Sequence, residues 1–244
     1  HGASNKIQEV NLKLSLLISK QKIKHIISIS KSVLYQIQIV KNKIPLTIIH
    51  CGVNSDYFKT ENKKQFINDS LQLLFVGVLY PHKNVNKLIE FVKNIILNNK
   101  NINLQIVGDG IEFNKLQKQI QKENMGKYIK LTGNISEEEL KKQFDSCDIY
   151  VTASSHEMLD MPAIEAMSMQ KPVLLSDLPA HNELIKNSKG GIIFNPENSK
   201  DFYNKLEEII EKKEQFSHNG RKFAEENDWD KITKKIINIY NELI

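Results

Sequence analysis

The sequence predicts an α/β protein whose main part is a doubly wound, Rossmann-like parallel sheet. Apolar runs of β-type residues alternate with segments of helical periodicity over residues 71–225, as in sheets that carry helices on their faces. Glycines follow the apolar runs 71–76 and 104–107, where turns at the ends of strands are expected. Residues 149–177 form the clearest unit, which reads strand, loop, helix, strand.

The first fifty residues contain a smaller pattern of the same kind. Apolar residues recur with helical spacing over 7–19, and a short β-branched run follows at 25–29. A segment able to form a helix, 31–40, separates that run from another at 46–49. Strand, helix and strand at this spacing predict a βαβ unit. Residues 51–70 are mostly polar and lack periodicity, so we expect a linker, with Gly52 as a turn or hinge glycine.

Within the main part, each predicted strand leads into a turn and a helix. The run 104–107 is followed by Gly108-Asp109-Gly110 and an amphipathic helix over 111–123. After the next strand, 129–132, Ser136 and Glu139 form a capping box for a helix over 137–146. A further helix is expected to begin near Glu183, and the last one carries an apolar stripe formed by Trp229, Ile232, Ile236, Ile239, Tyr240 and Leu243.

The unit at 149–177 contains two carboxylates. Glu157 lies in its loop and Glu165 on its helix, eight positions later. Pro162 suits the first turn of that helix, because the N–H that proline lacks is unpaired there anyway. A helix starting at this point directs N–H groups and a positive dipole end at the loop, an arrangement that favours phosphate. Taken alone, each Glu is more often a solvated surface residue than a ligand.

Composition sets limits on the partners. The net charge of +5 comes from lysines spread along the chain, and no basic-aromatic motif for nucleic acid is present. Cys51 and Cys147 fit no metal-ligand spacing and are expected to be reduced thiols. No apolar run reaches the length of a membrane span, so a cytoplasmic location is expected and any membrane contact would be peripheral. Because the chain begins with His1, we expect a fragment or a processed product.

Several segments resemble one enzyme family. The stretch SSHEMLDMPAIEAMSMQKPVLLSD is similar to the signature of retaining GT-B glycosyltransferases of the group 1 or family 4 type, in which a Glu, seven residues and a second Glu precede Ala-Met. Similar matches follow the family's order over about residues 20–244. The resemblance implies a remnant of the amino-terminal acceptor domain at 1–50, a linker at 51–70, a nucleotide-sugar-binding domain at 71–225, and a terminal helix at 226–244 that crosses back towards the acceptor domain.

The resemblance also implies site residues. Glu157 would be the catalytic carboxylate beside the transferred sugar, Lys83 would bind the donor diphosphate, and Glu165 would accept hydrogen bonds from the ribose hydroxyls. The other implied donor-binding residues are Gly77, Gly133, Asn134, Ile135 and Met161. The sequence departs from the family pattern in several places. Val78 stands where an Arg is usual, and Asn84 replaces a Gly. Met158-Leu159-Asp160 and Pro179-Ala180-His181 each replace a turn that is usually rich in glycine. An Asp160 carboxylate beside a diphosphate would repel it unless it points away.

The function implied by the resemblance is retaining transfer of a sugar from a UDP, GDP or ADP sugar to a sugar, lipid or protein acceptor. No cofactor and no bound metal are expected, and this chain alone would have little or no activity. Two alternatives remain open. One is a non-catalytic module that binds nucleotide sugar or protein, and the other is a hydrolase or epimerase of the same fold.

Overall fold

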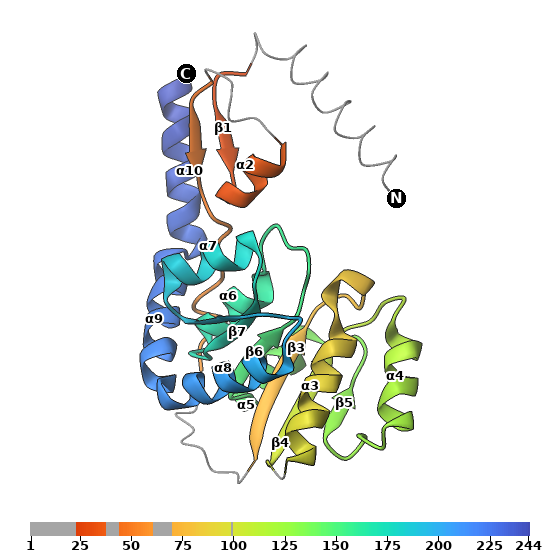
Figure 1. Ribbon diagram of the computed structural model, residues 1–244. Coiled ribbons are helices and arrows are strands. Elements are labelled where there is room, and N and C mark those ends of the chain that lie inside the picture. Colours follow the sequence, from red (N-terminus) through yellow and green to blue (C-terminus); the bar gives the residue numbers. More distant parts are fainter. Residues whose placement is uncertain (1–22, 38–43, 61–69, 99) are drawn as a thin grey trace, which may run out of the picture.

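The computed structural model describes residues 23–37, 44–60, 70–98 and 100–244 (Figure 1). Its larger sheet has six parallel strands in the order β5-β4-β3-β6-β7-β8. The strands are β3 (Leu71–Val76), β4 (Ile102–Val107), β5 (Ile129–Leu131), β6 (Ile149–Thr152), β7 (Val173–Ser176) and β8 (Gly191–Phe194). The chain builds outward from β3 in one direction and then returns to build outward from β6 in the other. The expected doubly wound fold class is therefore confirmed, with its switch point between β3 and β6.

Apolar side chains cover both faces of this sheet. All four residues of β6 and of β7 are buried, which explains why these segments read as continuous apolar runs rather than alternating ones. One face packs against helices α3 (Val85–Leu97), α4 (Phe113–Lys122) and α8 (Ser199–Glu211). The other face packs against α5 (Glu137–Ser146), α6 (Met161–Ser168), α7 (Pro179–Ser188) and α9 (Lys213–Glu226).

Two predicted helix starts can be compared with the structure, those of α5 and α7. Ser136 accepts a hydrogen bond from the Glu139 N–H at 3.2 Å, so the predicted cap of α5 is confirmed. The helix expected near Glu183 begins four residues earlier, at Pro179, so the prediction for Glu183 was wrong. Proline fits that first turn for the same reason as in α6.

A smaller sheet precedes the larger one. The strands β1 (Ile26–Ser28) and β2 (Leu46–Ile48) pair in parallel, and α2 (Lys31–Ile37) lies between them in sequence, which confirms the βαβ unit. The helix predicted at 7–19 lies outside the described residues. Both cysteines are free thiols, and burial raises the pKa of Cys147 to about 12. In the part of the chain that the structure describes, no helix is long and apolar enough to cross a membrane.

The last helix, α10 (Trp229–Leu243), packs against the small sheet (Figure 1). Ile232 and Ile239 form a buried cluster with Ile49, and Ile27, Ile236 and Leu243 pack around it. The predicted apolar stripe is only partly buried, because Trp229 is 46% exposed and Tyr240 is 59% exposed. The Trp229 ring nevertheless lies against Gly52, where a Cβ atom would come within 2.6 Å of it.

Two stretches of chain run between the sheets, and they are bonded to each other. Val53 N–H donates to Asn227 O at 3.1 Å, and Trp229 N–H donates to Val53 O at 3.3 Å. The Ser55 hydroxyl donates to the Asp228 carboxylate at 2.7 Å. This crossing therefore consists of two neighbouring segments joined by backbone and side-chain hydrogen bonds.

Candidate functional site

The candidate site lies at the carboxyl ends of β3, β4, β5 and β6, where the loops of the switch point meet. Three glycines let these loops pack closely. The N–H of Gly77 donates to Val107 O, and that of Gly108 donates to Gly133 O, both at 3.0 Å. A Cβ atom on Gly108, whose φ is +136°, would lie only 2.0 Å from Gly77 O. The glycine after β4 thus serves close backbone packing beneath the site.

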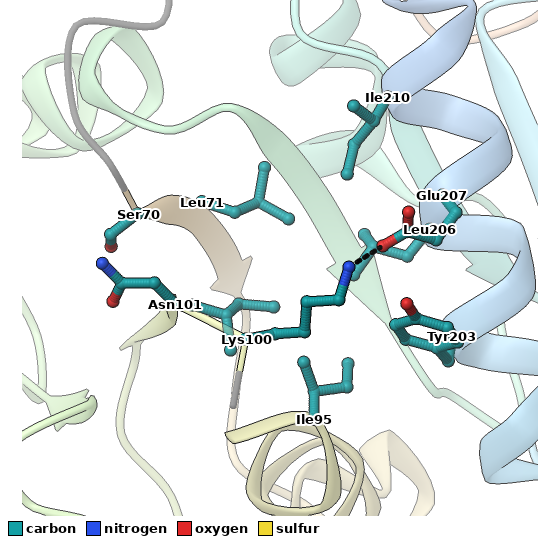
Figure 2. Close-up of a pocket in the computed structure, with 10 residues that line it drawn as sticks. Ser70, Leu71, Ile95, Lys100, Asn101, Tyr203, Leu206, Glu207 and Ile210 are labelled. Atoms are coloured by element: carbon teal, nitrogen blue, oxygen red, sulfur yellow. Dashed lines mark ion pairs between the residues drawn. The ribbon is translucent and has the colours of Figure 1, made fainter. Parts of the chain in front are cut away.

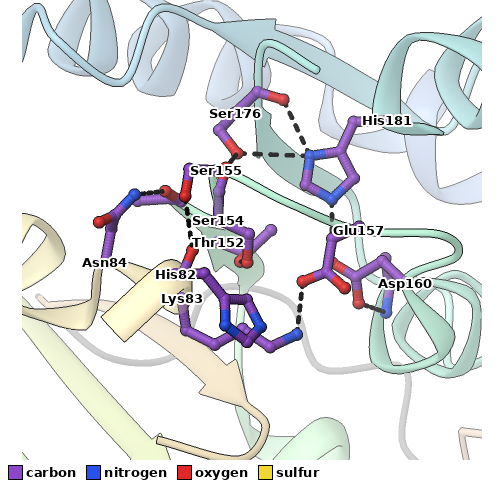
Figure 3. A network of polar contacts seen from close by, with 12 residues as sticks. His82, Lys83, Asn84, Thr152, Ser154, Ser155, Glu157, Asp160, Ser176 and His181 are labelled. Atoms are coloured by element: carbon purple, nitrogen blue, oxygen red, sulfur yellow. Dashed lines mark hydrogen bonds and ion pairs between the residues drawn. The ribbon is translucent and has the colours of Figure 1, made fainter. Parts of the chain in front are cut away.

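Lys83 and Glu157 meet at the switch point (Figure 3). Lys83 ends a short 3₁₀ helix, η2 (Pro81–Lys83), in the loop after β3, while Glu157 lies in the loop after β6. The Lys83 ammonium donates to Glu157 Oε1, and the two side chains are only 19% and 10% exposed. The structure therefore brings together two residues, 74 positions apart, that the sequence placed in the site.

Further hydrogen bonds hold these two loops against each other (Figure 3). Asn84 donates through its amide to Ala153 O at 3.0 Å, and Ser155 N–H donates to His82 O at 2.8 Å. Asn84 has a φ of +50°, a left-handed conformation that asparagine tolerates better than most residues. The change from glycine to asparagine is thus accommodated and adds a bond between the loops.

Glu165 lies half-buried on α6, close to the first turn of α5. Burial, and to a smaller extent the nearby Asp160 and Glu137 carboxylates, raise the pKa of Glu165 to about 7. Among the described residues, no side chain forms a hydrogen bond or ion pair with this carboxylate. Its oxygens are consequently free to accept bonds from a ligand.

The remaining predicted residues lie in the loop after β5 and at the start of α6. Gly133, in a left-handed conformation with a φ of +71°, follows β5 and begins the loop that continues through Asn134 and Ile135 to the start of α5. Asn134 is exposed, and Ile135 packs partly against the core. Met161 is the first residue of α6. These residues thus lie on loops or at a helix start, whereas Glu165 is the fifth residue of α6.

The Asp160 side chain points into the protein interior, which is the orientation that avoids placing its charge beside a diphosphate. Its side chain is buried, and its Oδ1 caps α6 by accepting from Ala163 N–H at 3.2 Å. Tyr150 O–H donates to the same carboxylate at 3.2 Å, and His181 Nε2 lies 3.3 Å from Oδ2. Asp before Met-Pro is a cap signal that sequence reasoning missed, whereas Tyr150 and His181 come from other elements and gave no local signal.

The cap changes what the start of α6 offers to an anion. Ala163 N–H is bonded to Asp160, Pro162 has no N–H, and Ile164 N–H donates to Asp160 O at 3.3 Å. Of the first four residues of α6, only Met161 has a backbone N–H that donates no hydrogen bond to another described residue. The positive helix end expected from the sequence is present, but few of its amides are free.

Three aromatic rings lie beside the Lys83 and Glu157 pair. Tyr80 stacks on His82 with ring centroids 6.0 Å apart, and His82 meets His156 edge-on at 6.4 Å. Burial and the adjacent Lys83 ammonium lower the pKa of His82. A neutral His82 ring is therefore favoured next to the lysine. Across the described ranges, no three His, Cys, Asp or Glu side chains are grouped so as to hold a metal ion.

A cavity of about 420 Å³ lies at the opposite edge of the sheet (Figure 2). Its walls include Leu71 and Ile102, the first residues of β3 and β4, together with Lys100, Tyr203 and Glu207. Because parallel strands all start at this edge, the cavity is separated from Lys83 and Glu157 by the length of the strands. It does not belong to the candidate site.

Comparison with known families and proteins adds independent information. The model of the family described as "Glycosyl transferases group 1" matches residues 56–227. An uncharacterized glycosyltransferase of Methanocaldococcus jannaschii is 28% identical over 222 residues, which cover 89% of this chain and 59% of that protein. The O-antigen chain mannosyltransferase RfbU of Salmonella typhimurium is 28% identical over 207 residues, covering 83% and 56% respectively. The chain thus spans less than two thirds of these relatives.

Solved structures show the same fold. Anabaena HepE in complex with UDP superposes with a TM-score of 0.83 over 96% of this chain and 68% of that one, at 17% identity. A sucrose-phosphate synthase from Thermosynechococcus elongatus gives a TM-score of 0.77 over 95% and 62%, at 21% identity. At these identities the likeness establishes the fold, and it agrees with the doubly wound sheet described above.

Proposed function

This chain belongs to the glycosyl transferases group 1 family, as its sequence resemblance predicted, and from this premise we propose that it carries the donor-binding part of a retaining glycosyltransferase. The substrate would be a nucleoside diphosphate sugar, and the product a sugar linked to an acceptor with its anomeric configuration retained. The rest of the acceptor site would come from residues beyond those described.

The observation that carries this proposal is the contact between Lys83 and Glu157 at the switch point. Ligands of doubly wound sheets bind at the carboxyl ends of the strands where the strand order reverses. A cation and an anion held together there, both mostly buried, offer one group for a phosphate and another for a developing positive charge. An ammonium has three protons, so Lys83 is able to bind Glu157 and a phosphate oxygen at once.

The Lys83 ammonium would take most of the diphosphate charge. The Val78 side chain, where the family usually has an Arg, supplies no donor, and the cap at Asp160 leaves mainly the Met161 N–H at the start of α6. The α6 dipole adds a favourable field even where its amides are bonded. These features support a phosphate site that depends strongly on one lysine.

Glu157 would act on the sugar. As the bond between the anomeric carbon and the diphosphate oxygen breaks, its electron pair leaves with the diphosphate, and positive charge develops on the sugar ring. A carboxylate beside that ring stabilises the charge, and Lys83 stabilises the departing anion. The acceptor hydroxyl would then attack from the side that the diphosphate leaves and pass its proton to an oxygen of the departing diphosphate, which retains the configuration.

Glu165 and the loop from Gly133 to Ile135 would bind the nucleoside. The Glu165 carboxylate has both oxygens available for two ribose hydroxyls. The loop after β5 leads into α5, and Glu137, the first residue of α5, is close enough to Glu165 to raise its pKa. UDP is bound in the Anabaena structure of the same fold. This supports testing uridine nucleotides first.

Isothermal titration calorimetry of the chain with UDP, GDP, ADP and their sugars tests this proposal. We expect one nucleotide series to bind, and Lys83→Ala and Glu165→Ala each to weaken binding at least about tenfold, since bonds to charged groups are worth about 1.5–3 kcal/mol. Lys87→Ala is the matched control. Lys87 follows Lys83 closely in sequence and also forms an ion pair, but its partner is Glu197 and it has no part in the proposed site. Binding that both site variants leave unchanged would contradict the assignment.

A second candidate is a module that binds a nucleotide sugar without turning it over. Val78, which is 51% exposed at the position of the usual Arg, favours this reading. Tight donor binding by the complete protein, with no release of nucleoside diphosphate in the presence of acceptor extracts, would support the module over the transferase.

A further inference from the structure

A cluster of buried polar side chains lies behind the loop that carries Glu157 (Figure 3). His181, the third residue of α7, is completely buried, as is Ser176 at the end of β7. Asp160 is 4% exposed and Tyr150 is 1% exposed. Every polar atom in such a place needs a partner, so the positions of the protons can be worked out from the distances.

The first proton to place is that of the Ser176 hydroxyl. Its oxygen lies 2.6 Å from Ser154 O, a carbonyl that only accepts, so the hydroxyl proton points there. His181 Nδ1 lies 2.8 Å from the Ser176 carbonyl oxygen, which also only accepts. Since Ser176 has no proton left to give, His181 Nδ1 must carry one and donate it.

The other ring nitrogen then faces a carboxylate. His181 Nε2 lies 3.3 Å from Asp160 Oδ2, which is within ion-pair distance, but it forms no hydrogen bond with any group of the described structure. The remaining contacts of Asp160 are both donors, namely Ala163 N–H and Tyr150 O–H. With Nδ1 protonated, a neutral ring would leave a buried and unpaired lone pair 3.3 Å from this carboxylate, an unfavourable arrangement.

We propose that His181 carries a proton on both ring nitrogens, is paired with the Asp160 carboxylate, and is a positioning residue for Glu157. The pair joins α7 to the cap of α6, three residues after Glu157 in the same loop. Lys83 holds this loop from its exposed side, and His181 holds it from the buried side. The catalytic meaning of this inference rests on the proposed function, whereas the protonation and the anchoring of the loop do not.

Other titratable groups act on the pair. Tyr150 projects from β6, and burial together with the charges of Asp160 and Glu157 raises its pKa well above the usual value, which keeps its O–H as a donor. Glu165 on α6 interacts electrostatically with Asp160.

Two variants separate the roles. In Asp160→Asn, the amide oxygen still accepts from Ala163 and Tyr150, and the amide N–H₂ donates to an unprotonated Nε2. The contact survives in that variant without the extra proton. In His181→Phe, a ring of similar size remains, but the hydrogen bond to Ser176 O and the ion pair with Asp160 are lost.

Nitrogen-15 NMR of the imidazole rings tests the proton directly, with the His181 signal assigned by its loss in His181→Phe. At pH 7 we expect both His181 nitrogens to be protonated in the parent chain and only Nδ1 in Asp160→Asn. A parent ring with an unprotonated Nε2 would overturn the proposal.

Amide hydrogen exchange of residues 155–157 and donor affinity test the positioning role. We expect faster exchange and about tenfold weaker donor binding in His181→Phe, with Asp160→Asn within about threefold of the parent at pH 7. Unchanged loop exchange in His181→Phe would reject the role. If the parent bound no nucleotide sugar, the proposed function would fail, while the NMR and exchange results would still decide this inference.

Discussion

The Glu183 carboxylate on α7 accepts hydrogen bonds from the backbone N–H of Lys31, which lies 3.0 Å from each of its oxygens. A third bond, from Ser32 N–H, is 3.2 Å long. Lys31 is the first residue of α2, so a side chain of the large sheet's helical layer caps a helix of the small βαβ unit. This contact, 152 positions apart in sequence, helps to fix one unit against the other.

Replacing Glu183 should therefore loosen α2. We expect Glu183→Ala to speed amide exchange at Lys31 and Ser32 and to lower the free energy of unfolding by about 1 kcal/mol, as for the loss of other helix caps. Glu211→Ala, at the exposed end of α8, is the control and should change neither quantity. Equal exchange rates in the two variants would show that the cap contributes nothing.

The glycine loops beneath the site make a second prediction. Gly108→Ala should lower the free energy of unfolding by about 2–4 kcal/mol, because alanine is strained at this positive φ and its Cβ would collide with Gly77 O. Gly126→Ala is a matched change with no atom within 4 Å of the new Cβ and should be neutral or slightly stabilising. Urea denaturation of both variants measures the difference, and similar midpoints would refute the packing argument.

Glu165 makes the stability of the fold depend on pH. Because its pKa is raised to about 7 from an ordinary 4.5, the folded protein holds a proton that the unfolded chain releases between these values. This contribution to stability is complete below about pH 4.5 and is lost as the pH rises to about 7. Glu165→Gln should consequently be more stable than the parent by up to about 2–3 kcal/mol at pH 8 and nearly equal to it at pH 4.5.

Denaturation of the parent, Glu165→Gln and Glu138→Gln at several pH values checks this. Glu138 is exposed in the first turn of α5, so its replacement should leave the pH dependence as in the parent. A stability difference between the parent and Glu165→Gln that does not change with pH would contradict the raised pKa.

The exposed Val78 allows a gain of function to be tested. Val78→Arg restores a fork of donors at the family's usual Arg position, and we expect donor affinity to rise about fivefold to tenfold, or about 1 kcal/mol. Leu97→Arg adds the same charge at another exposed apolar position, at the end of α3 and away from the site. Calorimetry should show no gain for Leu97→Arg. Equal gains in both variants would mean that net charge, rather than geometry, attracts the donor.

Much of the fold was predictable because its signals are local. The run Leu71–Val76 matches β3 residue for residue, and the Ser136 cap marks the start of α5. The strand β4 begins at Ile102, two residues before the predicted start. The prediction started at Leu104 because Asn103 interrupts the apolar run. The Asn103 side chain donates to Ser70 Oγ at 2.7 Å. Ser70 directly precedes the neighbouring strand β3, so a local sequence pattern cannot reveal this partner.

The candidate site was predictable only through the resemblance to a family. Nothing in the spacing of Lys83 and Glu157 indicates that they touch, since the contact depends on the parallel pairing of β3 with β6. The sequence left open whether Asp160 points towards a ligand or away from it, because its partners Tyr150 and His181 lie on a strand and on another helix. Only the folded arrangement shows where that charge is neutralised.

The bonds between Val53 and residues 227–229 have a mechanical consequence. Two separate connecting segments would allow the small sheet to move in several directions. Because the segment at Val53 is hydrogen-bonded to residues 227–229, the two connections act as a single hinge. Any swing of the small sheet must turn about this point, and it carries α10 along because Ile232 and Ile239 are packed into it.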